Sequence, residues 1–256
     1  MPPCHAGFLE FVMKWIYLSP HLDDAVYSCG GLIHQQVQQG IDVEIWTVFA
    51  GQFDAANLTP FAKDIHQRWG TGLESITLRK AEDQEACTLL GVNTSYFDFQ
   101  DVIYRFKPET SQAEIIENDD LFREYHPGDN ALMESITQVV RQAALRMQQI
   151  QLCIPLGLGN HIDHQIVRRS AEALIDSYPI LYYADFPYVI RSQAQPDGLQ
   201  QRQFALSEAD VEIWCQAVAI YKSQISTFWD DEAQICEEIF PYWKKGGGSC
   251  LWFHEQ

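Results

Sequence analysis

The sequence predicts an α/β fold in which a mainly parallel sheet is covered by helices on both faces. Short apolar strand-like segments alternate with segments of helical spacing, in the order β-α-β and then α-β-α-β-α. The chain has 256 residues, which is enough to bury one substantial core without disulfides. We therefore expect one domain over residues 1–256 with a Rossmann-like three-layer α/β/α arrangement and a C-terminal helical elaboration at about 207–256.

The expected strands are short, apolar and followed by polar or turn-forming residues. They occupy residues 15–18, 42–48, 95–99, 152–156 and 180–183. The expected helices place apolar residues three or four positions apart, and two of them end at a glycine that suits the position after a helix. They occupy residues 25–39, 78–90, 130–149, 163–177 and 208–221. A glycine-rich loop at 244–248 precedes a short apolar end at 250–253.

The charge and the cysteines limit the classes of partner and compartment. There are 17 Lys and Arg against 35 Asp and Glu, a net charge of −18, which argues against binding nucleic acid or an anionic membrane surface. No apolar run reaches the ~18–20 residues that cross a bilayer, and the first 15 residues do not resemble a signal peptide. The seven cysteines are odd in number and form no C-x-x-C pair, so we expect a reducing, cytoplasmic setting.

Two polar clusters directly follow two of the expected strands. The first is Ser19-Pro-His-Leu-Asp-Asp24, and the second is Gly157-Leu-Gly-Asn-His-Ile-Asp-His164. The carboxyl ends of central parallel strands border the ligand crevice of such folds, so we expect the two clusters to converge. Imidazole and carboxylate groups suit a catalytic zinc ion, which takes three protein ligands and keeps one open position. The remaining carboxylate and imidazole complete a set for metal-assisted hydrolysis.

Each of these residues also has a purely structural interpretation. A single histidine in a loop is more often solvated or hydrogen-bonded than a metal ligand. Asp23 and Asp24 precede an expected helix and suit its N-terminus, and Asp163 suits the start of its own helix. Two separate clusters at two strand ends nevertheless favour a shared metal site.

Three motifs carry a family resemblance. They are Pro20-His-Leu-Asp-Asp24 with the trailing Gly30-Gly31, Arg79-Lys-Ala-Glu82 leading to Leu90-Gly91, and His161-Ile-Asp-His164. In this order they resemble the PIG-L/LmbE-like family of zinc-dependent N-deacetylases, over residues 15–183. Leu22 stands where the family commonly has proline, which predicts a less rigid turn.

The resemblance implies the metal ligands and the general base. His21, Asp24 and His164 would bind Zn²⁺, with Fe²⁺ as the alternative metal. Asp23 would remove a proton from the attacking water and pass it to the departing amine.

The resemblance also implies groups that stabilise charge and bind substrate. His161, protonated, would polarise the amide carbonyl, and Asp163 would hold His161 in its cationic form. Arg79 and Asp101 would contact sugar hydroxyls. Independently of the resemblance, Tyr183 and Tyr188 follow a strand end, which makes them candidates for stacking on a sugar, although aromatic residues there more often belong to the core and its rim.

The expected function is therefore a zinc-dependent N-deacetylase that removes an acetyl group from an N-acetylated amino sugar or glycoconjugate. One alternative is an amidase of the same mechanism that acts on a non-sugar amide, such as a thiol conjugate. A second alternative is a non-catalytic protein that binds a carbohydrate or nucleotide. Gly157-Leu-Gly159 lacks the third glycine of a dinucleotide loop, which disfavours a nucleotide ligand. The sequence leaves the oligomeric state open, a homo-oligomer included.

Overall fold

A single mixed sheet runs through the computed structural model, which describes residues 13–107, 109–192 and 198–255. Its strands, in the order in which they lie side by side, are β3 (Asn93–Tyr96), β2 (Val43–Thr47), β1 (Lys14–Ser19), β4 (Ile150–Pro155), β5 (Ile180–Tyr183), β7 (Cys250–Phe253) and β6 (Gln200–Gln203). The first five are parallel, whereas β7 runs antiparallel to both β5 and β6. The expected mainly parallel sheet is confirmed.

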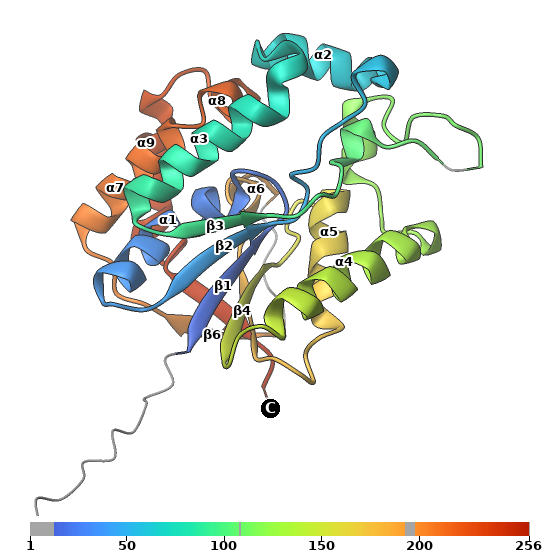
Figure 1. Cartoon of the computed structure of the whole chain (residues 1–256). Helices are drawn as coiled ribbons and strands as arrows, with labels where there is room; N and C mark the ends of the chain where they lie inside the picture. Colours follow the sequence, from blue (N-terminus) through green and yellow to red (C-terminus); the bar gives the residue numbers. More distant parts are fainter. Residues whose placement is uncertain (1–12, 108, 193–197, 256) are drawn as a thin grey trace, which may run out of the picture.

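Helices cover both faces of this sheet, as Figure 1 shows. The α-helices are α1 (Asp24–Gln38), α2 (Pro60–Trp69), α3 (Ser75–Leu90), α4 (Asn130–Ala144), α5 (Ile162–Glu172), α6 (Tyr188–Ser192), α7 (Glu208–Ala219), α8 (Lys222–Phe228) and α9 (Ala233–Lys244). Short 3₁₀ helices lie in the connections: η1 (Ala55–Asn57), η2 (Gly72–Glu74), η3 (Val102–Tyr104), η4 (Asn118–Phe122) and η5 (Pro127–Asp129). The buried apolar residues form two clusters, one with α1, α3, α7 and α9 and the other with α2, α4 and α5. The expected three-layer arrangement is therefore present.

The register between β1 and β4 brings the two polar clusters together. Tyr17 pairs with Cys153, and the strands end nearby, at Ser19 and Pro155. Both strands are almost wholly buried, so their side chains pack against helices on both faces, as is typical of parallel sheets. The residues that follow each strand consequently leave the sheet at the same edge.

The element boundaries differ from the expected ones mainly at loops. The strand expected at 95–99 is β3 at Asn93–Tyr96, because Phe97 donates to Thr47 and Asp98 then forms only an isolated bridge with Phe49. The helices expected at 130–149 and 163–177 end at Ala144 and Glu172.

Several elements were not expected from the sequence. These include α2 and α9, and the apolar end at 250–253 proves to be β7, which pairs with β5. The C-terminal elaboration is thus not only helical, because its last strand extends the sheet. Among the described residues, no helix is long and apolar enough to span a bilayer.

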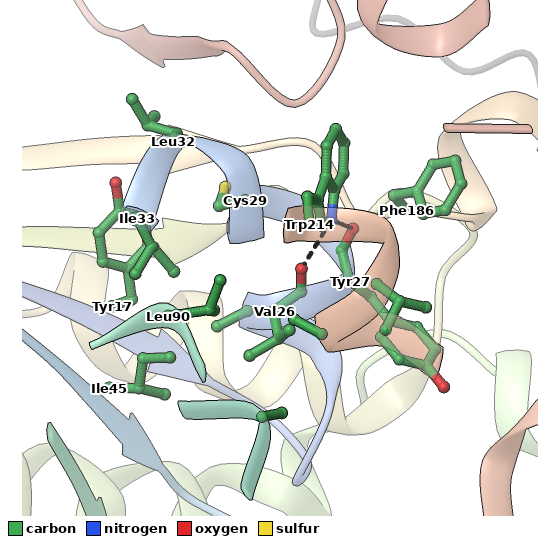
Figure 2. Packing of buried hydrophobic residues seen from close by; sticks show 14 of the residues in the cluster. Tyr17, Val26, Tyr27, Cys29, Leu32, Ile33, Ile45, Leu90, Phe186 and Trp214 are labelled. Carbon is green, nitrogen blue, oxygen red and sulfur yellow. Dashed lines mark hydrogen bonds between the residues drawn. The ribbon is translucent and has the colours of Figure 1, made fainter. Parts of the chain in front are cut away.

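Close packing of α1 against α7 explains the glycine pair in the first motif. A Cβ atom added to Gly30 would lie 2.5 Å from Cδ1 of Trp214, which is closer than van der Waals contact allows. The indole of Trp214 is buried there and donates to the carbonyl oxygens of Val26 and Tyr27, at 2.9 and 3.1 Å. Figure 2 shows these bonds across the helix pair. Gly30 therefore fixes α1, whose first turn carries Asp24, against the C-terminal helices.

We expect Gly30→Ala to lower the free energy of unfolding by about 1–3 kcal/mol, because overpacking outweighs the ~1 kcal/mol that alanine gains in a helix. Gly31→Ala is the matched control, since its Cβ would meet the flexible end of Leu206 at 3.1 Å. Urea unfolding of both variants measures the difference. Equal stability of the two variants would contradict this account of the packing.

Candidate active site

The turn between β1 and α1 supplies the first side chains of the site. The hydroxyl of Ser19 donates to the carbonyl oxygen of His21 at 2.6 Å and accepts from the backbone N–H of Ala25 at 3.0 Å. The backbone N–H of His21 donates to Oδ2 of Asp24 at 2.8 Å. These bonds hold the turn together without the family's usual proline. They point His21, Asp23 and Asp24 into one cavity.

The loop after β4 supplies the second group of side chains. His161 is the residue before α5, and its Nδ1 accepts from the backbone N–H of Asp163 at 3.3 Å. His164 follows one turn later. The imidazole rings of His21, His161 and His164 lie with centroids 5.0–5.5 Å apart, so the two loops meet as expected.

Two histidines present one ring nitrogen toward Asp24 and bind a carboxylate through the other. Nδ1 of His21 lies 3.1 Å from Oδ2 of Asp24, and its Nε2 lies 3.1 Å from Asp163. Nε2 of His164 lies 3.3 Å from Oδ1 of Asp24, and its Nδ1 lies 2.7 Å from Asp185. A carboxylate on the far nitrogen is the usual support of a metal-binding imidazole.

These donors fit a divalent metal. Nε2 of His164 is buried and makes no hydrogen bond among the described residues. Two imidazole nitrogens and one carboxylate oxygen match a catalytic zinc site with an open position. Two groups of possible ligand atoms lie within 4.8 Å of one another. One group is His21, His161 and His164, and the other is His21, Asp101 and Asp163.

Burial and neighbouring charges set the protonation of this group. Burial and the charge of Asp24 raise the pKa of Asp23 to about 6, although Arg79 opposes the shift. Burial disfavours a charged His164, but Asp24 and Asp185 outweigh it and raise the pKa of that imidazole to about 9. A metal at this position would therefore displace a proton from His164.

The expected role of Asp163 in holding His161 in its cationic form stays a prediction, and the structure shows which groups the two residues contact. The Asp163 carboxylate contacts His21 and Arg105, and only its backbone N–H reaches the ring of His161. Burial, together with the charges of His21 and His164, lowers the pKa of His161 well below its usual value. Both this lowered pKa and the backbone N–H donated to Nδ1 favour the neutral imidazole with its proton on Nε2.

Arg79 and Asp101 also lie in the cavity, as expected. Arg79 extends from α3 with its Nη2 3.5 Å from Oδ2 of Asp23 and its Nη1 3.9 Å from Oδ2 of Asp101. The guanidinium lies 4.8 Å from the ring centre of Trp69 on α2. All eight site residues expected from the sequence are therefore gathered at one end of the sheet.

The cavity has a volume of about 350 Å³, with polar groups at its base and aromatic residues among its walls. The wall residues come from α2, η4, α6 and α8: Phe61, Trp69, Phe122, Tyr188, Gln224 and Phe228. Of the two tyrosines considered from the sequence, only Tyr188 lines the cavity. Tyr183 is fully buried, and its hydroxyl donates to the carbonyl oxygen of Leu18.

Asp185 and Arg105 are functional neighbours that the sequence analysis missed. Asp185 stands two residues after β5, which lies beside β4. Polar residues just after neighbouring parallel strands were the signal for the other two clusters, and the same signal could have found Asp185. Arg105 follows η3 and contacts Asp163, a pairing between distant residues for which the sequence offers no signal.

The fold and this set of side chains define a metal-dependent hydrolase site in an α/β/α domain. The sequence profile of the PIG-L family, described as GlcNAc-PI de-N-acetylase, matches residues 16–175. The chain belongs to the PIG-L family. The expected family is confirmed.

Three proteins that this chain resembles are deacetylases. The 2'-N-acetylparomamine deacetylase of Niallia circulans is 26% identical over 237 residues, which cover 86% of this chain and 84% of that protein. The zinc-inhibited form of teicoplanin deacetylase Orf2 is 25% identical and superposes with a TM-score of 0.81, covering 94% of this chain and 97% of that one. The A40926 pseudoaglycone deacetylase Dbv21 is 26% identical with a TM-score of 0.74, covering 94% and 96%.

The helix that carries Arg79 is fastened by two acidic residues of its next turn. Glu82 accepts from the backbone N–H and the hydroxyl of Ser223, at the start of α8. Asp83 accepts from the hydroxyls of Tyr96 and Tyr221, each at 2.7 Å. Burial raises the pKa of Asp83 to about 6, although both tyrosines favour the ionised form.

We expect Asp83→Asn to change how stability depends on pH. The pKa of Asp83 is about 6 in the folded state against 3.8 for the free side chain, so its stabilising contribution is present below pH 4 and is lost as the pH rises through 6. Asparagine cannot ionise. Between pH 5 and pH 8 the wild type should lose about 1–2 kcal/mol more unfolding free energy than the variant.

Chemical unfolding at both pH values measures this difference. The control is Glu85→Gln, which removes an exposed carboxylate from the same helix. If Asp83→Asn and the wild type lose the same free energy from pH 5 to pH 8, Asp83 is already ionised at pH 5.

Proposed function

We propose that the protein hydrolyses the acetamide of an N-acetylated amino sugar, or of a glycoconjugate that bears one, as a zinc-dependent deacetylase. One observation carries this proposal: His21, Asp23 and Asp24 line the base of one cavity, and the buried His164 lies beside Asp24, with its Nε2 3.3 Å from Oδ1. Membership of the PIG-L family and the deacetylase relatives support the same reaction.

His21, Asp24 and His164 would hold the metal. A divalent ion there supplies Lewis acidity, which makes water a better nucleophile near neutral pH. We assign Zn²⁺ because the donors are two imidazoles and a carboxylate; the zinc-inhibited form of teicoplanin deacetylase indicates that a related chain binds zinc, and Fe²⁺ is the alternative.

Asp23 acts as the general base. Its pKa of about 6 leaves it ionised at pH 7 yet close enough to neutrality to accept a proton and release it again. It takes a proton from the attacking water and delivers it to the nitrogen of the departing amine. The guanidinium of Arg79, 3.5 Å away, lowers the pKa of Asp23. Without this charge the buried carboxylate would stay protonated up to a higher pH.

His161 stabilises the oxygen of the scissile carbonyl. Its Nδ1 accepts from a backbone N–H, so its Nε2–H is free to donate toward the carbonyl oxygen as negative charge develops there. A neutral donor of this kind contributes about 10²–10³ in rate in other hydrolases.

The walls of the cavity suit a sugar. Arg79 and Asp101 offer a donor and an acceptor for ring hydroxyls, and Trp69, Phe122 and Tyr188 offer aromatic surfaces for its apolar face. The net charge of −18 favours a small-molecule substrate over a nucleic acid. The odd number of cysteines and their lack of C-x-x-C pairs support a cytoplasmic location.

We expect Asp23→Asn to keep the metal and lose turnover by about 10²–10⁴, whereas His21→Ala loses both. Zinc content is measured by elemental analysis, and amine release is followed on a panel of N-acetylglucosamine glycosides with and without chelator. Wild-type turnover in Asp23→Asn would contradict the general-base role. A wild-type chain that takes up no zinc would favour a carbohydrate-binding protein instead.

The variant Arg79→Ala distinguishes the proposed deacetylase from the alternative, an amidase that acts on a non-sugar amide. Arg79 lies beside Asp23, so both classes of substrate should lose some activity. A sugar substrate should lose about 10-fold or more beyond that in kcat/KM, the order of one lost charged hydrogen bond. Paired measurements on N-acetylglucosamine and on a small acyl amide give the ratio. Equal losses on the two substrates would reject the sugar assignment.

A further inference from the structure

The fully buried Asp163 is clamped between three groups. Its Oδ2 accepts from the backbone N–H of Val102 at 2.9 Å and lies 3.1 Å from Nε2 of His21. Its Oδ1 lies 2.7 Å from Nη2 of Arg105. The contact between Oδ1 and Arg105 is an ion pair without hydrogen-bond geometry, and His21 is the imidazole that the carboxylate contacts.

Arg105 is itself held in place from several sides. Its Nη1 donates to the carbonyl oxygen of Gln100 at 3.1 Å, and its Nε lies 3.5 Å from Glu114. The guanidinium lies 5.3 Å from the ring centre of Phe49, and the side chain is only 11% exposed. A cation buried to this degree needs an anionic partner, and Asp163 provides it.

The contact with Asp163 determines which nitrogen of His21 keeps its proton when a metal binds. Both ring nitrogens face carboxylates, and an ionised carboxylate only accepts, so without a metal Nε2 donates to Asp163 and Nδ1 donates to Asp24, each at 3.1 Å. A metal held by Asp24 would displace the proton of Nδ1 and leave the proton of Nε2 on Asp163. In His164 the relation is reversed, because Asp185 binds Nδ1 and leaves Nε2 available.

We infer that Arg105 is a positioning residue of the metal site: it holds Asp163 on Nε2 of His21 and thereby fixes the tautomer through which Nδ1 binds the metal. This inference rests on the metal site of the proposed function and is independent of its substrate. Without Arg105, Asp163 keeps only the backbone N–H of Val102 and is free to rotate away from His21. His21 then samples both tautomers and binds metal less tightly.

Zinc affinity, measured by competition with a chromophoric chelator, tests this inference without any deacetylation assay. Arg105→Met should weaken zinc binding about 10–100-fold, the usual effect of losing a carboxylate that supports a metal-binding histidine. Arg105→Lys keeps the charge and should recover at least part of the loss. The matched control is Arg123→Met, because Arg123 contacts the same Glu114 but not Asp163. That variant should bind zinc as the wild type does.

A double-mutant cycle keeps the test valid if Arg105→Met also disturbs the fold. Asp163→Asn alone should weaken zinc binding by a similar factor, and adding Arg105→Met to it should weaken binding no further. Long-range ¹H–¹⁵N spectra of the zinc-loaded protein with ¹⁵N-labelled histidine should show a proton on Nε2 of His21 in the wild type. That signature should be lost in Arg105→Met, while the signature of His164 persists.

Additive losses in the cycle would overturn the inference, as would wild-type affinity in a folded Arg105→Met. A proton on Nδ1 of His21 in the zinc-loaded wild type would also overturn it. A wild type that binds no zinc would instead reject the proposed metal-dependent function, so the two failures are distinguishable.

Discussion

The parallel pairing of β1 with β4 is the constraint on which the site depends. It places the turn after Ser19 beside the loop after Pro155, although more than 130 residues separate them in the chain. A shift of one residue in this register would turn every strand side chain to the opposite face and move the two loops apart. The buried strands on both sides hold the register, so the chemistry depends directly on the hydrophobic core.

Charge balance is the second constraint, because the site concentrates anions in a region with little solvent. Five buried carboxylates lie there: Asp23, Asp24, Asp101, Asp163 and Asp185. Two buried guanidinium groups and the imidazoles offset only part of that charge. A doubly charged ion at the two histidines would supply much of the remainder, and it would replace protons that the imidazoles otherwise carry.

The parts of the molecule that the sequence predicts well are those with local signals. Buried strands show continuous apolar runs, and the motifs around His21 and His164 combine unusual residue types at fixed spacing. The mainly parallel sheet then follows from the alternation of strands with helices. The side chains of both motifs lie together at one end of the sheet for the same reason.

Contacts between distant residues could not be predicted in this way. Arg105 meets Asp163 from the segment after η3, which pairs with residues 112–114, and nothing in its neighbours along the chain indicates that contact. The strand at β7 is four residues long and pairs with β5 at a single register position, so its signal is too short to separate from a loop. The neutral form of His161 depends on its burial beside two other imidazoles, which only the assembled site reveals.

The cavity draws its base and its walls from different parts of the chain. The base comes from the loops after β1 and β4, together with Arg79 and Asp101, whereas the walls come from α2, η4, α6 and α8. Wall residues such as Phe122 and Phe228 make none of the bonds that orient His21 or His164. Such a division makes the site evolvable: mutation can reshape the walls for a different amine part of the substrate while the residues at the base are inherited unchanged.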